Sequence, residues 1–223
     1  MFPTALLTDS GFWSFSALYV LSVAVVTALV VWMLSRFGTM PRIEKFIPRW
    51  VAVLFTLLII EQFFHQAEHV TQMYQFQFLG IQARDAHGFV WFLDDEWNHF
   101  TFNTIYMVGI TTVFIYLMRG LHRAKIAFTA VNLVFIVLFL AMEGWHIVEH
   151  TYRIIHHVQG LCDQCVGILD PLTGINRLLI HFWLNFFALM MPAVVYVWYR
   201  IPQMTFPRFR IKSRLPQSFS PAL

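Results

Sequence analysis

The sequence predicts an all-α integral membrane protein with five transmembrane helices, four of which form a bundle built from two parallel two-helix repeats. Of its 223 residues, 58% are hydrophobic and only 12% are charged, a composition typical of membrane proteins rather than soluble domains. Five apolar stretches come near the roughly 20 residues that a transmembrane helix needs. In addition, the motif HxxEH occurs twice, which indicates an internal repeat.

The five predicted helices make up one membrane domain, residues 1–223. Residues 12–35 are expected to form a retained first helix rather than a signal peptide, because no basic segment precedes this run and no small-residue cleavage site follows it. The first repeat comprises helices at 50–75 and 98–118, and the second comprises helices at 126–150 and 178–199. Residues 200–223 form a basic tail, which leaves no room for a separate soluble domain.

The evidence for duplication is the order and spacing of two motifs. HQAEH at 65–69 returns as HIVEH at 146–150, and HFTFN at 99–103 returns as HFWLN at 181–185. His69 and His99 are 30 residues apart, and His150 and His181 are 31 residues apart. Each unit is therefore predicted to have a helix that ends in HxxEH, a loop, and a return helix that opens with HFxxN. Two such units in succession are parallel repeats about an axis along the membrane normal.

Lysine and arginine predict the orientation. Twelve of the 15 basic residues fall within 36–49, 119–125 and 200–214, and only Arg84, Arg153 and Arg177 fall on the other side. Because basic residues favour cytoplasmic loops, the N-terminus is predicted to be outside and the C-terminus cytoplasmic, in a plasma (inner) membrane. The net charge of +3 is thus a topology signal, and no nucleic-acid partner is predicted. The expected partners are the lipid bilayer and other membrane subunits or an electron donor.

The repeated motifs place polar side chains on one face of each helix. Residues i, i+3 and i+4 share a helix face, and a polar patch that faced lipid would be costly, so both patches are expected to face the bundle interior. The helix depth, counted at 1.5 Å per residue, brings these groups to the outer boundary of the hydrocarbon. The candidate site residues are His65, Glu68, His69, His99, His146, Glu149, His150 and His181.

Six histidines around one axis favour a transition-metal site. Imidazole is the commonest protein ligand for such ions, and two imidazoles at i and i+4 can chelate one ion. The simplest arrangement is dinuclear, and the two glutamates would bridge the ions or orient the ligands. One ion would be held by His65, His69 and His99, and the other by His146, His150 and His181. Iron or copper is favoured, and zinc also suits the ligands. A site of this kind predicts a redox or oxygen-activating membrane enzyme or subunit, whose catalytic residues the sequence does not identify.

Three alternatives use the same histidines. A haem with bis-histidine ligation, for example by His69 and His150, would make an electron-transfer subunit, but it leaves four histidines without a role. A hydrogen-bonded interhelical cluster would make a structural or non-catalytic metal-binding subunit. HxxEH is also the zinc motif of the inverted-zincin metallopeptidases, although those have one copy and a distant acidic ligand. The arrangement resembles the di-iron carboxylate bundles only in its logic, because histidine replaces most carboxylates.

Three further features carry less information. Cys162 and Cys165 fit a disulfide, a zinc site with the adjacent histidines, or free thiols. The acidic residues before the helix at 98–118 are expected to interact with its N-terminus. Glu61 and Glu143 precede the two motifs without aligning in the repeat, and they fit either a proton relay or a structural hydrogen-bonding role.

Overall fold

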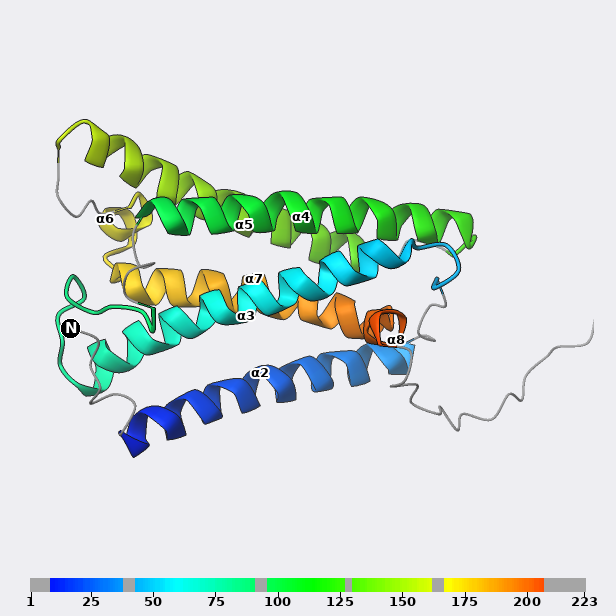
Figure 1. Cartoon of the computed structure of the whole chain (residues 1–223), viewed down its shortest axis with the longest axis horizontal. Helices are drawn as coiled ribbons and strands as arrows, with labels where there is room; N and C mark the ends of the chain where they lie inside the picture. Colours follow the sequence, from blue (N-terminus) through cyan, green and yellow to red (C-terminus); the bar gives the residue numbers. More distant parts are fainter. Residues whose placement is uncertain (1–8, 38–42, 91–95, 127–129, 162–166, 207–223) are drawn as a thin grey trace, which may run out of the picture.

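A computed structural model describes residues 9–37, 43–90, 96–126, 130–161 and 167–206. Its regular elements are all helices, which confirms the predicted all-α class for the described residues. Five are long and two are short: α2 (Ser10–Phe37), α3 (Arg49–Phe78), α4 (Glu96–Arg123), α5 (Ala130–Val158), α6 (Leu169–Thr173), α7 (Arg177–Trp198) and α8 (Ile201–Thr205). Successive long helices run in opposite directions along the long axis of the molecule (Figure 1).

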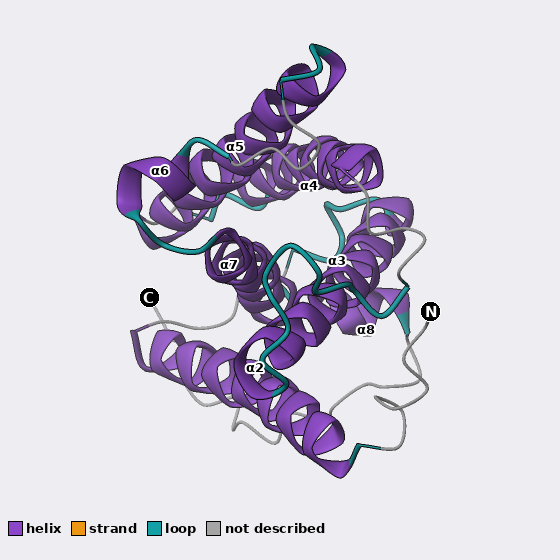
Figure 2. Ribbon diagram, turned by 90° about the vertical axis from the view of Figure 1, so that its left-hand side faces the viewer, coloured by secondary structure: helices purple, strands orange, loops and turns teal. Residues whose placement is uncertain are grey.

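Four of the long helices close a ring. Helix α3 packs against α4 and α7, and α5 completes the ring by packing against the same two helices. Helix α2 lies outside this bundle and contacts α3 and α7 (Figure 2). The bundle therefore consists of the four helices that carry the repeated motifs, and the first long helix is an addition to it.

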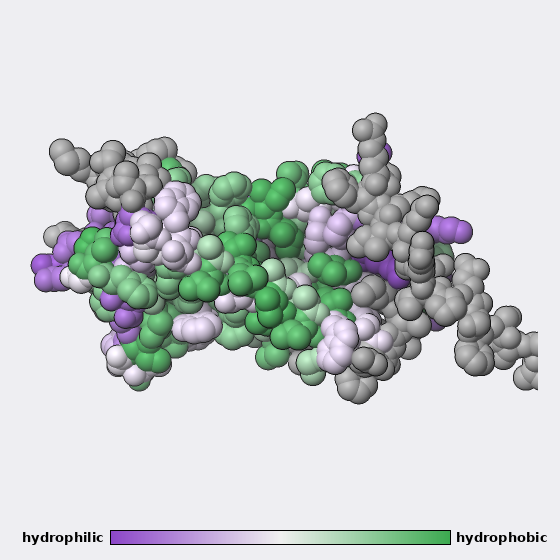
Figure 3. All heavy atoms as spheres, turned by 90° about the horizontal axis from the view of Figure 1, so that it is seen from below, coloured by the Kyte–Doolittle hydropathy of each residue, from purple (hydrophilic) through white to green (hydrophobic). Residues whose placement is uncertain are grey.

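Four helices of the described part are long and apolar enough to cross a membrane, namely those at Ser10–Ser35, Arg49–Phe78, Glu96–Arg123 and Arg177–Trp198. Helix α5 is not among these four, although its 29 residues give it a similar length. Large apolar side chains are exposed on the helix surfaces, for example Leu18, Phe64 and Val108. Apolar residues also predominate in the middle of the face in Figure 3, and hydrophilic residues lie toward its ends. A lipid bilayer is the environment that such a surface suits.

The bundle interior has an apolar half and a polar half. The apolar half is filled by side chains such as Phe55, Ile110, Phe114 and Phe139. The polar half lies where α3 and α5 terminate and α4 and α7 begin. We call this the loop end of the bundle. Tyr106 belongs to the apolar cluster, and its hydroxyl donates to the carbonyl oxygen of Ala188 at 2.7 Å.

Both helices run past their predicted ends: α3 ends at Phe78 rather than at 75, and α5 ends at Val158 rather than at 150, where its HxxEH motif ends. The histidines therefore lie about two turns inside these helices rather than at their ends. Each helix stops shortly before a glycine in the left-handed region, Gly80 (φ 66°) or Gly160 (φ 67°), where glycine avoids the cost that a Cβ atom would bring. The polar residues that follow HxxEH in α3 belong to the helix and are partly turned into the protein, where Gln72 and Gln75 are buried.

Candidate metal centre

The six repeated histidines come together at the loop end of the bundle. His65, His69 and His99 form one group, and His146, His150 and His181 form the other, and within each group the ligand nitrogens lie within 4.8 Å of one another. Five of the six residues are buried, and His99 is partly buried. Helices α3 and α4 supply the first group, which we call triad one, and α5 and α7 supply the second, triad two. Among the described residues, only histidines make up these groups.

Within each HxxEH motif, the two imidazoles point their Nε2 atoms at each other. The Nε2 atoms of His65 and His69 are 3.1 Å apart, and those of His146 and His150 are 3.0 Å apart. Two lone pairs cannot face each other at this distance, so one nitrogen of each pair must carry a proton. A metal ion bound by both nitrogens would take the place of that proton. The i, i+4 spacing thus produces the convergent geometry that a chelate requires.

The two triads pack directly against each other. Ring centroids are 5.7 Å apart for His99 and His150, 6.0 Å for His69 and His181, and 6.5 Å for His65 and His146. When each histidine is replaced by its equivalent in the other triad, the pair His99–His150 becomes His181–His69, and the pair His65–His146 stays the same. The contacts between the triads therefore follow the order of the repeated motifs. Two ions bound by the triads would therefore be close neighbours in one cluster rather than occupants of separate sites.

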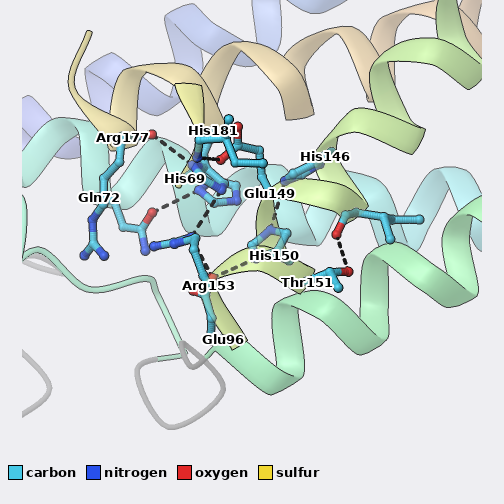
Figure 4. A network of polar contacts seen from close by, with 12 residues as sticks. His69, Gln72, Glu96, His146, Glu149, His150, Thr151, Arg153, Arg177 and His181 are labelled. Carbon is cyan, nitrogen blue, oxygen red and sulfur yellow. Dashed lines mark hydrogen bonds and ion pairs between the residues drawn. The ribbon is translucent and has the colours of Figure 1, made fainter. Parts of the chain in front are cut away.

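Neighbouring groups hold three of the rings through Nδ1. His69 Nδ1 lies 2.9 Å from Oε1 of Gln72, His150 Nδ1 lies 2.8 Å from Oε1 of Glu96, and His181 Nδ1 lies 2.9 Å from the carbonyl oxygen of Arg177 (Figure 4). Each partner is an oxygen acceptor, so Nδ1 carries the proton and the lone pair of the neutral ring is on Nε2. Such outer partners typically fix the orientation of histidine ligands in metal sites.

Glu68 and Glu149 contact the loops rather than the centre of the cluster. Both carboxylate oxygens of Glu68 accept from the backbone N–H of Val90 at 3.0 Å. Glu149 accepts from the N–H groups of Ile168 and Leu169 at 2.7 and 2.8 Å. The contacts match in the two units, because Val90 and Leu169 each stand two residues after a glycine. Each carboxylate is thereby bonded to the segment that follows its own helix, and neither contact points to a bridge between two ions.

The glycines of these loops allow the carboxylates to approach the backbone. A Cβ atom added at Gly88 would collide with Oε2 of Glu68, and one added at Gly167 would collide with Oε2 of Glu149. The close approach therefore requires glycine at both positions. This pair of contacts offers a direct test of how the loops are held.

We expect Gly88→Ala and Gly167→Ala each to destabilise the protein by about 1–3 kcal/mol, the cost of losing a charged hydrogen bond or leaving a buried carboxylate unsatisfied. Thermal unfolding in detergent, with protease digestion of the loops, measures this effect. Gly144→Ala in α5 is the matched control, because a Cβ atom there meets no atom within 4 Å and alanine favours a helix by roughly 0.5–1 kcal/mol. Identical unfolding curves for the three variants would contradict the assigned role of the two carboxylates.

Three residues of the site have no metal-ligand signature in the sequence. Gln72 and Arg153 stand at equivalent positions, three residues after the last histidine of each HxxEH motif. Arg153 forms an ion pair with Glu96 at 2.6 Å and lies 3.3 Å from Nε2 of His181. Glu96 opens α4 as the helix-terminal carboxylate that the sequence predicts, but it also contacts His150. Helical spacing was the available signal for Gln72 and Arg153, since i+3 continues the polar face.

A second polar layer lies one helical turn deeper in the bundle. Gln62 donates from Nε2 to Oδ1 of Asn185 at 2.9 Å. Its equivalent in the second unit is Glu143, whose Oε2 lies 3.7 Å from Nδ1 of His146. Within the described residues, Oε1 of Glu143 and both amide atoms of Asn103 have no hydrogen-bond partner. This layer therefore carries a carboxylate at the position beside triad two where the first unit has the neutral Gln62, and in the described part of the chain both units leave polar atoms unpaired at this depth.

Cys162 and Cys165 lie outside the described residues. The adjacent histidines, His156 and His157, lie on α5 beyond the cluster, and the His156 ring packs on Tyr152 with centroids 4.0 Å apart.

No family model, curated protein or solved structure matches this chain. Fold and site together define its class. It is a helical protein with the apolar helices of a membrane protein and two buried groups of three histidines that could hold metal ions.

Proposed function

We propose that this chain is an integral membrane metalloprotein whose two histidine triads hold a dinuclear transition-metal centre with a redox or oxygen-activating role. The observation that carries the proposal is the convergence of six imidazoles from four helices into two adjoining groups. A group of three imidazoles leaves an open coordination position on a bound ion, as catalytic metal sites do. Bound iron or copper would supply one-electron and oxygen chemistry, and such a role implies an electron donor or partner subunit.

The chemistry of the ligands favours ions of low charge. Six neutral imidazoles bring no negative charge into the membrane interior, so the charge of the ions must be offset by neighbouring carboxylates, since an uncompensated buried charge is costly. Glu96 contacts His150, and Glu143 lies beside His146. Copper cycles between singly and doubly charged ions and suits imidazole ligands, so this charge argument favours copper, whereas iron is retained for its redox chemistry.

The ring contacts favour ions over haem. A porphyrin placed between histidines of the two triads would have to separate the three ring pairs that now pack at 5.7–6.5 Å. The peptidase alternative also fits poorly, because its motif glutamate must reach the metal-bound water. Here Glu68 and Glu149 accept hydrogen bonds from the loop backbone instead.

The proposed membrane arrangement counts α5 as a fifth crossing, because α5 closes the ring with α4 and α7. The two units then form parallel repeats in a plasma (inner) membrane. With the basic segments on the cytoplasmic side, the N-terminus and the loop end are outside. In a Lys125→Cys variant, the new thiol is expected to react with a thiol reagent only from the cytoplasmic side. Reaction with a reagent added outside would contradict this orientation.

Metal analysis of the purified protein by mass spectrometry, together with its visible spectrum, tests the proposal. We expect close to two iron or copper ions per chain and no Soret band. A Soret band would replace the proposal with the haem alternative. Stoichiometric zinc would exclude the redox role but keep the metal centre, whereas folded protein that takes up no transition metal would leave only the structural cluster.

A further inference from the structure

The two triads have the same ligands but different neighbours. Gln72, three residues after the last histidine of its motif, accepts from Nδ1 of His69. The equivalent residue in the second unit is Arg153, which is buried and carries a fixed positive charge. A positively charged side chain repels a cation bound next to it, so the presence of Arg153 beside triad two calls for an explanation. The two units can therefore be compared directly, with a neutral residue in the first and a charged residue at the equivalent position of the second.

Arg153 lies between a carboxylate and a ligand nitrogen. Its NH1 atom is 2.6 Å from Oε1 of Glu96 and 3.3 Å from Nε2 of His181 (Figure 4). Nδ1 of His181 donates to the carbonyl oxygen of Arg177, so the lone pair of the neutral ring is on Nε2. That lone pair accepts from Arg153 in this structure. It cannot bind a metal ion at the same time.

We propose that Arg153 competes with the metal ion for Nε2 of His181, so that all three histidines of triad two can bind one ion only after Arg153 withdraws, and the competition lowers the affinity of this triad. This inference rests on the proposed function. Glu96 keeps the guanidinium nearby after it withdraws, because their ion pair does not involve His181. The ion of triad two is consequently the exchangeable one, with a ligand position that opens when Arg153 returns.

Glu143 acts in the opposite direction. Its carboxylate lies beside Nδ1 of His146, on the side of the ring away from Nε2, and it favours a cation in triad two. A comparison of metal affinity between the two triads would therefore combine the attraction by Glu143 with the effect of Arg153. The informative comparison is triad two with and without Arg153.

The experiment measures Co²⁺ binding to the metal-free protein in detergent, by the visible absorption of the bound ion, in two backgrounds. His99→Ala weakens triad one and leaves triad two to be measured, whereas His181→Ala does the reverse. Arg153→Gln, which copies the residue of the first unit, is added to each. We expect Arg153→Gln to raise the Co²⁺ affinity about 10- to 100-fold in the His99→Ala background, the range typical of changes behind a metal ligand. No change is expected in the His181→Ala background.

Equal affinities with and without Arg153→Gln in the His99→Ala background would overturn the inference while the metal centre stands. Equal gains in both backgrounds would overturn it as well, because the effect would then not pass through His181. If the wild-type protein binds no Co²⁺, the proposed function fails and the inference fails with it. Arg153→Met removes the same charge, and it takes the place of Arg153→Gln if that variant does not fold.

Discussion

Replacing His99 or His181 with alanine is expected to remove about half of the bound metal. Each residue is the only ligand that its triad takes from the second helix of the unit, far in sequence from HxxEH. Losing a direct ligand costs more than the 10- to 100-fold in affinity typical of changes behind the ligands, so the affected triad should be nearly empty at micromolar metal. Metal per folded chain, measured by mass spectrometry for all six single alanine variants, tests this expectation.

The pattern across the six variants separates the alternatives. Two adjoining triads predict that His99→Ala resembles His69→Ala, and that His181→Ala resembles His150→Ala. A bis-histidine haem would make two histidines essential and leave four tolerant. A structural cluster would lower protein yield without any change in metal. His157→Ala is the control, because this exposed residue on α5 lies outside both triads. Full metal in the His99 and His181 variants, with loss in the HxxEH variants, would refute the dinuclear arrangement.

The sequence predicts which histidines come together, because the i, i+4 spacing of each motif and the cost of polar groups in lipid apply to the same residues. Two imidazoles at i and i+4 must share a face, and in a membrane that face must turn inward. The repeat then indicates which histidines on the return helices belong with them. His99 and His181 could be assigned in this way although no local motif marks them as ligands, and the structure brings both to their triads.

The roles of the charged residues could not be predicted in the same way. Glu68 shares the polar face with its histidines, which predicts a role at the metal ions. In the structure its carboxylate instead accepts a hydrogen bond from the backbone N–H of Val90. Whether a loop returns to a helix in this manner depends on its path, which helical spacing does not reveal. Arg153 and Glu96 are 57 residues apart, and their ion pair depends on how α4 and α5 pack. The helix ends were predictable from Gly80 and Gly160, which are stronger stop signals than the polar residues before them.

Acidification is expected to release the metal, and the steepness of the release reports the kind of ligand. A protonated imidazole has no lone pair for an ion, so acid favours the metal-free state, and release begins at or below the ordinary histidine pKa of about 6.5. Three imidazoles per ion allow up to three protons to compete with each ion, so affinity should fall by as much as about 1000-fold per pH unit in the steepest range. Ions held by carboxylates would stay bound until about pH 4, where glutamate and aspartate become protonated.

Equilibrium dialysis against a metal buffer between pH 8 and pH 4 measures this dependence. Slow exchange from a buried site could imitate tight binding, so equilibrium should be approached both by loading metal-free protein and by unloading metal-bound protein. Agreement of the two curves, with loss of metal below about pH 6.5, is the expected result. If both curves instead stay flat down to about pH 4, the result counts against histidine as the ligand and favours the carboxylates around the cluster, which become protonated only near that pH.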